Sequence, residues 1–252
     1  MPDPFAGLLG GFDAVGLAEI ESVALLDRTD TKYLLPVGRL PAILAAIADD
    51  YRVLEVAGRR ATPYETLYFD TPRLDCYRRH HAGRAVRTKV RARRYASTGD
   101  CFVEVKRRDN HARTIKRRLP VEGIPESLTG GAARFVGSES GLDPGSLAGT
   151  LWVDYLRATL VGRRSPERVT IDRGLDYRGA DGGRFAGLMI VEVKRPRAAA
   201  PSAVGRELQR RGVFPAGVSK YCLGMVTTHP GIPRNNFLAS LRHVDRVLHA
   251  AG

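Results

Sequence analysis

The segment Val86–Tyr95, VRTKVRARRY, carries a cation at every second position. Alternate residues of a β-strand share one face, so Arg87, Lys89, Arg91 and Arg93 would lie on the same side of a sheet. Neighbouring cations would be roughly 6.6 Å apart, with a repulsion of about 0.6 kcal/mol in water and about 2.5 kcal/mol at an effective dielectric of 20. A sheltered anion would relieve this repulsion, whereas a strand with its basic face in water needs no ligand.

Other predicted strands repeat this charged alternation, and several add a carboxylate to the cations. Valines and isoleucines occupy many of the intervening positions. If the sheet closes with the charged faces inward, they line an interior wide enough for a ligand. If these faces point outward, the sheet is an ordinary amphipathic one, and the pattern does not decide between the two. The alternating positions are Arg28, Asp30 and Lys32; Glu104, Lys106 and Arg108; Lys116 and Arg118; and Glu192 and Lys194.

The order of patterns predicts an α+β fold with an antiparallel sheet and packing helices. A long surface connection is expected around 130–146, which is rich in Gly and Ser. Amphipathic helical patterns are found at 38–50, 71–83, 146–160, 202–212 and 235–250. Runs of β-branched and aromatic residues predict strands at 23–36, 64–70, 86–95, 101–108, 113–121, 168–177 and 187–196.

Two local predictions concern the ends and faces of these elements. Asp70 lies in an Asp-Thr-Pro sequence, which suits a strand end followed by a helix start, so its carboxylate is expected to orient that turn. Trp152 and Tyr155 are expected on the core face of the predicted helix 146–160.

The charge balance narrows the class of partner. Forty Lys and Arg against 27 Asp and Glu leave a formal charge of +13, which favours nucleic acid, an anionic membrane or polyphosphate compounds. Only 7% of the residues are aromatic and no RNP-like or zinc-finger pattern occurs, so no nucleic acid is expected. A P-loop motif is also absent from the sequence.

Cysteine usage and hydropathy indicate the compartment. The three cysteines show no C-x-x-C spacing, which fits a reducing environment. No apolar run approaches the roughly 20 residues that a transmembrane helix needs, and the N-terminus lacks a basic leader region. A cytoplasmic protein without a transmembrane segment is therefore expected.

The order of eight motifs resembles the VTC domain of polyphosphate polymerases, a branch of the triphosphate tunnel metalloenzymes, which also include the CYTH phosphatases. The resemblance runs from about Leu26 to Val226, and it implies a closed antiparallel β-barrel of about eight strands, a basic tunnel, with flanking helices. It implies one domain over 1–252, with a core at about 20–228 and a C-terminal helix at about 233–250. The motifs are RTDTKYLLP, YFDT, VRTKVRARRY, FVEVKRR, IKRRLP, RVTIDRGL, IVEVKR and SKYCLG.

The resemblance also implies roles for individual residues. Glu192 matches the metal-binding glutamate, for Mn²⁺ or Mg²⁺, and three other acids, Asp30, Glu104 and Asp172, would either bind metal or orient cations. The cations matched to catalytic positions are Lys32, Arg91, Arg93, Lys106, Arg168 and Lys220. Those expected to add phosphate-binding capacity are Arg28, Arg87, Lys89, Lys116, Arg118 and Lys194.

Three functions are compatible with these residues. The resemblance favours a polymerase that transfers the γ-phosphoryl group of ATP to a growing polyphosphate chain or a pyrophosphate primer. A tunnel-type triphosphatase and a non-catalytic polyanion-binding module are the alternatives. The phosphatase branch typically opens with E-x-E-x-K, whereas Arg28 and Asp30 occupy those acidic positions here. Arg195 and Arg197 follow the E-V-K motif where an aromatic residue is common, and the chain resembles the stand-alone bacterial form.

Overall fold

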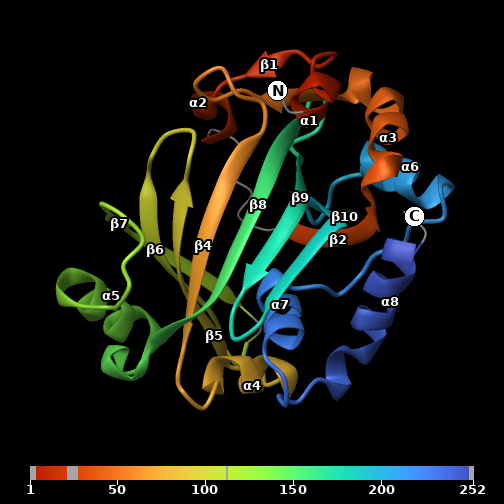
Figure 1. The fold of residues 1–252 in the computed structure, drawn as a ribbon. Helices are drawn as coiled ribbons and strands as arrows, with labels where there is room; N and C mark the ends of the chain where they lie inside the picture. Colours follow the sequence, from red (N-terminus) through yellow and green to blue (C-terminus); the bar gives the residue numbers. More distant parts are fainter. Residues whose placement is uncertain (1–3, 22–27, 112, 250–252) are drawn as a thin grey trace.

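A computed structural model describes residues 4–21, 28–111 and 113–249. Eight antiparallel strands form one curved sheet with helices around it (Figure 1). The predicted strands 64–70, 86–95, 101–108, 113–121, 168–177 and 187–196 are confirmed, as is 23–36 over its described part. In spatial order the strands are β2 (Arg28–Pro36), β10 (Gly182–Pro196), β9 (Arg168–Arg178), β8 (Ala148–Gly162), β4 (Thr62–Asp70), β5 (Arg87–Tyr95), β6 (Cys101–Arg108) and β7 (Thr114–Val121).

The predicted closed barrel is not confirmed, because β2 and β7 end the sheet and no hydrogen-bonded pairing joins them in the part of the chain described. Both edge strands carry cations on the concave face. Lys89, Lys106 and Lys116 lie opposite one another on paired strands, so like charges alone do not prevent strand pairing in this sheet.

The remaining elements cover the ends and the convex face of the sheet. The short strands β1 (Ala14–Val15) and β3 (Tyr51–Leu54) extend it beside β8. The helices predicted at 38–50, 71–83, 202–212 and 235–250 are confirmed by α3, α4, α6 and α8, residue 250 lying outside the described residues. The helices are α1 (Pro4–Leu8), α2 (Leu17–Glu21), α3 (Leu40–Ala46), α4 (Asp75–His81), α5 (Gly130–Ser140), α6 (Ala203–Arg210), α7 (Lys220–Thr228) and α8 (Leu238–His249), with 3-10 turns at Val37–Arg39, Ala48–Asp50, Pro144–Ser146 and Asn235–Phe237.

Apolar side chains on the convex face attach two groups of helices. Met189, Val191 and Val193 of β10 pack in one core cluster with α3 and α6. Val90 and Val103 pack in a second cluster against α5, which lies beside β6 and β7 in Figure 1. Because strand residues alternate between faces, this packing directs the charged positions between these residues to the concave face.

The predicted helix at 146–160 is wrong, because this segment is the central strand β8. Its leucines and alanines mimic a helical period, but Leu151, Val153 and Tyr155 are buried at alternate positions of a strand. Two hydrogen-bonded neighbours, β4 and β9, fix the extended conformation against the local helix propensity. Trp152 and Tyr155 therefore lie on opposite faces of the sheet rather than on one helix face.

The predicted surface connection at 130–146 is also wrong over most of its length. Gly130–Ser140 forms α5, and Val136 is fully buried against the convex face. Gly and Ser are poor helix formers, so the helix depends on this packing rather than on propensity. The helix α7 lies where the sequence indicated only the SKY motif, and it packs on the concave side against β8, β9 and β10.

Candidate functional site

The strand register brings the predicted charged residues together on the concave face. Lys89 lies opposite Lys106, which lies opposite Lys116 on the next strand. At the other edge of the sheet, Lys32 lies opposite Glu192. The strand residues assigned to this face by the register are Arg28, Lys32, Arg87, Lys89, Arg91, Arg93, Lys106, Lys116, Arg118, Arg168, Glu192 and Lys194, and Lys220 joins them from the start of α7.

Glu192 lies between two lysines near the edge strand β2. Lys32 Nζ is 3.1 Å from Glu192 Oε1, and Lys194 Nζ donates to Oε2 at 2.6 Å. Burial opposes ionisation of this carboxyl group, but the two lysines hold its pKa well below the usual range. Burial also lowers the pKa of Lys194, to about 8, despite the adjacent carboxylate. Glu192 is therefore anionic at neutral pH.

Glu104 is a second carboxylate held by two cations. Arg91 Nε donates to Glu104 Oε2 at 2.6 Å, and Lys116 contacts the other oxygen. Burial opposes ionisation, yet Arg91, Arg93 and Lys116 keep the pKa of Glu104 well below its usual range. The carboxylate thus fixes Arg91 in the floor of the concave face, which supports the predicted orienting role of this acid.

Asp172 forms a third such cluster and identifies an arginine that the sequence analysis missed. Arg157 of β8 donates from Nε to Asp172 Oδ1 at 2.5 Å and from Nη2 to Oδ2 at 2.7 Å, and Lys220 contacts the same carboxylate. Burial opposes ionisation of Asp172, but Arg157 and Lys220 lower its pKa to about 2. Arg157 was missed because its segment was predicted as a helix; its alternation with Tyr155 was the signal available.

Six of the cations named above have no carboxylate partner among the described residues: Arg87, Lys89, Arg93, Lys106, Arg118 and Arg168. Lys89 donates only to the hydroxyl of Ser219 at 2.8 Å, and Arg93, which is buried, only to the hydroxyl of Thr66 at 3.2 Å. Burial lowers the pKa of both Lys89 and Arg168. Buried cations are normally paired, and Arg93 is buried while Lys89 and Arg168 are half-buried, so this face has a surplus of positive charge of the kind that an anion site requires.

Tyrosines form the floor beneath these cations. Arg93 and Arg157 lie over the Tyr64 ring at 5.3 and 4.8 Å from its centroid, and Arg91 donates to the Tyr68 hydroxyl at 3.1 Å. Burial opposes ionisation of Tyr68, but Arg91, Arg93 and Lys89 lower its pKa to about 8. The aromatic faces stabilise cations without neutralising them.

The turn after β4 positions the start of α7. As predicted, Asp70 orients its turn, since its carboxylate accepts from the backbone amides of Thr71, Cys76 and Tyr77. It also accepts from the Tyr221 hydroxyl at 2.5 Å. This bond holds the residue next to Lys220, so α4 and α7 are tied together below the charged face.

A preformed cage for a divalent ion is absent from the described part of this face. No group of three or more metal-ligating side chains occurs within the residues that the structure covers. Three buried hydroxyls, of Tyr155, Thr170 and Tyr177, have no hydrogen-bond partner there, and Thr170 lies directly opposite Glu192 in the sheet. Mg²⁺ is commonly held by one or two carboxylates with substrate phosphates and waters, which suits one available acid.

The sequence matches one family model, that of the VTC domain, over residues 27–229. The chain belongs to the VTC domain family. Among curated proteins, no relative matches this sequence. The match covers all eight antiparallel strands from β2 to β7 in the spatial order given above, so the three acidic clusters of this VTC domain lie inside it.

A solved structure with low sequence identity shares the fold. A Hippeastrum protein, first assigned as an adenylyl cyclase and described as having a dominant triphosphatase activity, is 15% identical, with a TM-score of 0.53 over 82% of this chain and 98% of the other. A Bacillus halodurans protein, also assigned as an adenylate cyclase, is 10% identical, with a TM-score of 0.47 over 77% of this chain and 94% of the other. The first likeness shows an α+β tunnel-type fold rich in antiparallel strands.

Within 4–21, 28–111 and 113–249, none of the helices has both the length and the apolar character to cross a bilayer.

Proposed function

We propose that residues 1–252 form one VTC domain that transfers the γ-phosphoryl group of ATP to an inorganic polyphosphate chain, starting from a polyphosphate or pyrophosphate primer. The observation that carries this proposal is the surplus of cations on the concave face. Three carboxylates are each held by two cations, and six further cations, among them Lys89, Arg93 and Arg168, remain for an anionic ligand. The family match supports an enzyme of the tunnel type.

The length of the cationic row favours a polymer over a triphosphate. Arg87 and Arg93 lie six residues apart on β5, so the row extends for roughly 20 Å along the strand. A triphosphate spans about half of that distance or less. Lys106 and Lys116 widen the row across two further strands. A chain of phosphates would engage the whole row, with arginines binding oxygens in pairs and lysines acting as mobile point charges.

The proposed reaction needs positioning and charge neutralisation rather than a protein nucleophile. A terminal oxygen of the polyphosphate attacks the γ-phosphorus, the bond from that phosphorus to the β–γ bridging oxygen breaks, and ADP leaves with the electron pair. Arg91 and Arg157, both fixed by carboxylates, would bind the transferred group, and Lys32 and Lys220 would hold its neighbours. Bound Mg²⁺ or Mn²⁺, held by Glu192, would supply further charge neutralisation on phosphate oxygens.

A triphosphatase is the second candidate, supported by the activity described for the Hippeastrum protein. In that reaction water replaces the chain end as acceptor. An acid near the site would be needed to orient the water. Asp30 is the remaining carboxylate of the concave face, and it accepts from Arg28 Nε at 3.0 Å, which favours a structural role for it.

The test incubates the purified protein with ATP and Mn²⁺ or Mg²⁺, with and without pyrophosphate, and resolves polyphosphate from free phosphate. Lengthening chains with ADP release are expected, and Glu192→Gln should abolish them. The matched control is Glu139→Gln on α5, whose carboxylate faces Arg117 at 3.9 Å on the convex side. Release of free phosphate without chains would contradict the polymerase and favour the triphosphatase. Binding without turnover would contradict both proposals.

A further inference from the structure

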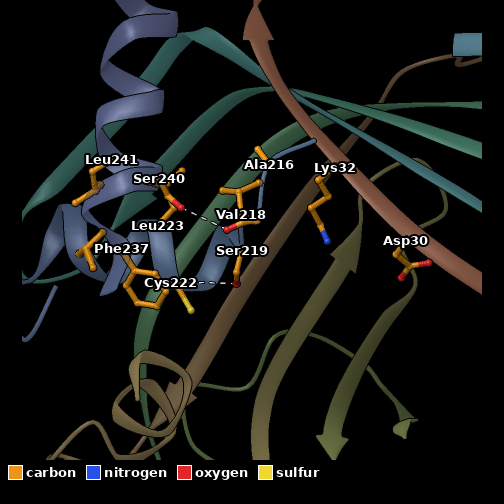
Figure 2. A pocket seen from close by; sticks show the side chains of 12 residues that line it. Asp30, Lys32, Ala216, Val218, Ser219, Cys222, Leu223, Phe237, Ser240 and Leu241 are labelled. Carbon is orange, nitrogen blue, oxygen red and sulfur yellow. Dashed lines mark hydrogen bonds between the residues drawn. The ribbon is translucent and has the colours of Figure 1, made fainter. Parts of the chain in front are cut away.

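A cavity of about 230 Å³ lies beside the charged face, between β2 and the helices α7 and α8. Figure 2 shows Lys32 and Asp30 on β2, across from Leu223, Phe237 and Leu241. Most of the wall is apolar, and the charged groups come from the edge strand alone. The cavity therefore combines an apolar interior with a charged rim.

Two of the residues that line this cavity also belong to the proposed phosphate site. Lys32 Nζ is 3.1 Å from Glu192, and the Ser219 hydroxyl accepts from Lys89 Nζ at 2.8 Å. The edge strand is tied to the cavity wall because the Ala216 amide donates to the Lys32 carbonyl at 2.8 Å. A ligand that fills the cavity would have its anionic end at Lys32, next to Glu192.

The size and the lining restrict the apolar part of such a ligand. Pockets for drug-sized ligands are typically about 300–1,000 Å³, so a cavity of about 230 Å³ holds a planar ring system rather than a whole nucleotide. Phe237 is a half-buried aromatic residue of the wall, and the hydroxyls of Ser219 and Ser240 are hydrogen-bonding groups. Proteins bind purine and pyrimidine bases with such groups, by stacking on an aromatic side chain and by a few polar contacts.

We propose that this cavity binds the base of a nucleoside triphosphate whose phosphates lie on the concave face. This inference rests on the proposed function, and it adds the place at which the base of the donor nucleotide binds. The ribose lies at the rim, where the Asp30 carboxylate can accept from its hydroxyls, and the triphosphate passes Lys32 toward Glu192. The donor thus occupies the β2 side of the face, and the polyphosphate acceptor occupies the row on β5 and β6.

The experiment compares two ligands that share their phosphates and differ in the base. Adenylyl imidodiphosphate and inorganic tripolyphosphate are titrated by calorimetry into the wild type and three variants. Ser240→Phe fills the cavity and Phe237→Ala removes its aromatic wall. Leu238→Phe is the matched control, because Leu238 is exposed on α8 and does not line the cavity.

The Kd for the nucleotide is expected to rise about tenfold in both cavity variants, the order of a lost base–aromatic stack, while the Kd for tripolyphosphate stays within about twofold. The control should change neither. An equal change for both ligands, or no change for the nucleotide, would overturn the base site while leaving the phosphate site intact. A wild-type protein that binds neither ligand would overturn the proposed function as well.

Discussion

The concave face of the sheet has two halves of opposite chemistry on the same strands. Glu192 and Lys194 of β10 lie in the charged half, whereas Leu188 and Ile190, on the same side of the same strand, are fully buried in the cluster that contains α7. The register of β10 therefore places both the charged candidate site and a part of the hydrophobic core on the concave face. The apolar half fixes the position of α7, and the first residue of that helix, Lys220, enters the charged half. The apolar half thus contributes to stability and the adjacent charged half to the candidate site.

The largest expected effect is that of Arg157→Met in the charged half. Removing this arginine leaves the buried Asp172 carboxylate with Lys220 alone, and the loss of one partner of a buried pair costs about 3–5 kcal/mol in the free energy of unfolding. Urea denaturation should show a lowered midpoint. The control is Arg178→Met, whose pair with Asp154 is more exposed than the pair of Arg157 with Asp172, so its loss should cost less. Similar losses in both variants would remove the distinction between the two kinds of pair.

Glu192→Gln should lower turnover per folded molecule, and it should also lower stability because Lys32 and Lys194 lose their carboxylate partner. The substitution keeps the shape of the side chain but removes the charge that would hold a divalent ion, so chain synthesis should fall by about a hundredfold or more. In the apolar half, Ile190→Ala should have a different profile, with a loss of about 2–5 kcal/mol in the free energy of unfolding and turnover per folded molecule retained. Turnover and urea denaturation are measured on both variants. A Glu192→Gln protein with normal turnover would contradict the assignment of this glutamate.

Gly224→Ala tests how closely α7 must approach the sheet. A Cβ atom at this position would lie 2.5 Å from the Tyr177 ring and 2.7 Å from a Leu151 methyl carbon. The overlap should cost about 1–3 kcal/mol in the free energy of unfolding and weaken tripolyphosphate binding through a displaced Lys220. Gly38→Ala is the control, since a Cβ there meets nothing within 4 Å. Unchanged thermal stability in Gly224→Ala would show that the helix can move away without loss.

The smallest expected effect is a pH dependence of ligand affinity. The pKa of Lys194 is about 8, below the usual value for lysine, so this side chain loses its charge as the pH rises through 8. The Kd for tripolyphosphate should therefore rise severalfold between about pH 7 and 9. The unfolding free energy should not fall over this range, because the unfolded state binds the extra proton and the penalty for the buried charge disappears.

Lys194→Arg provides the control for this pH profile. A guanidinium stays protonated throughout, so the variant should flatten the dependence of Kd on pH. Calorimetric titrations at several pH values would measure it. An unchanged slope in the variant would assign the titration to another group.

The sequence predicted the charged face better than it predicted the elements that surround it. An alternation of period two places residues on one face whatever the strand order, so the cations of Val86–Tyr95 were grouped correctly without any tertiary information. The seven predicted strands were confirmed for the same reason, the first over its described part, and the family resemblance was confirmed as well. The roles given to individual cations remain predictions.

The errors occurred where tertiary contacts override local preference. In β8, leucine and alanine imitate a helix, and only the two neighbouring strands make the segment extended, so Arg157 was not placed at the site. In α5, glycine and serine suggest a loop, and only packing on the convex face makes a helix. The expected closure of the barrel depended on the relation between β2 and β7, which are far apart in the sequence.

The exposed strand β7 has a consequence for self-association. An edge strand offers unpaired backbone groups to a second copy of the chain, and lysine or arginine on such an edge is a common protection. Lys116, Arg117 and Arg118 lie in a row on β7, and all three are exposed. Two copies that paired along this edge would bring the rows together. The strand that ends the sheet thereby carries its own barrier against edge-to-edge assembly.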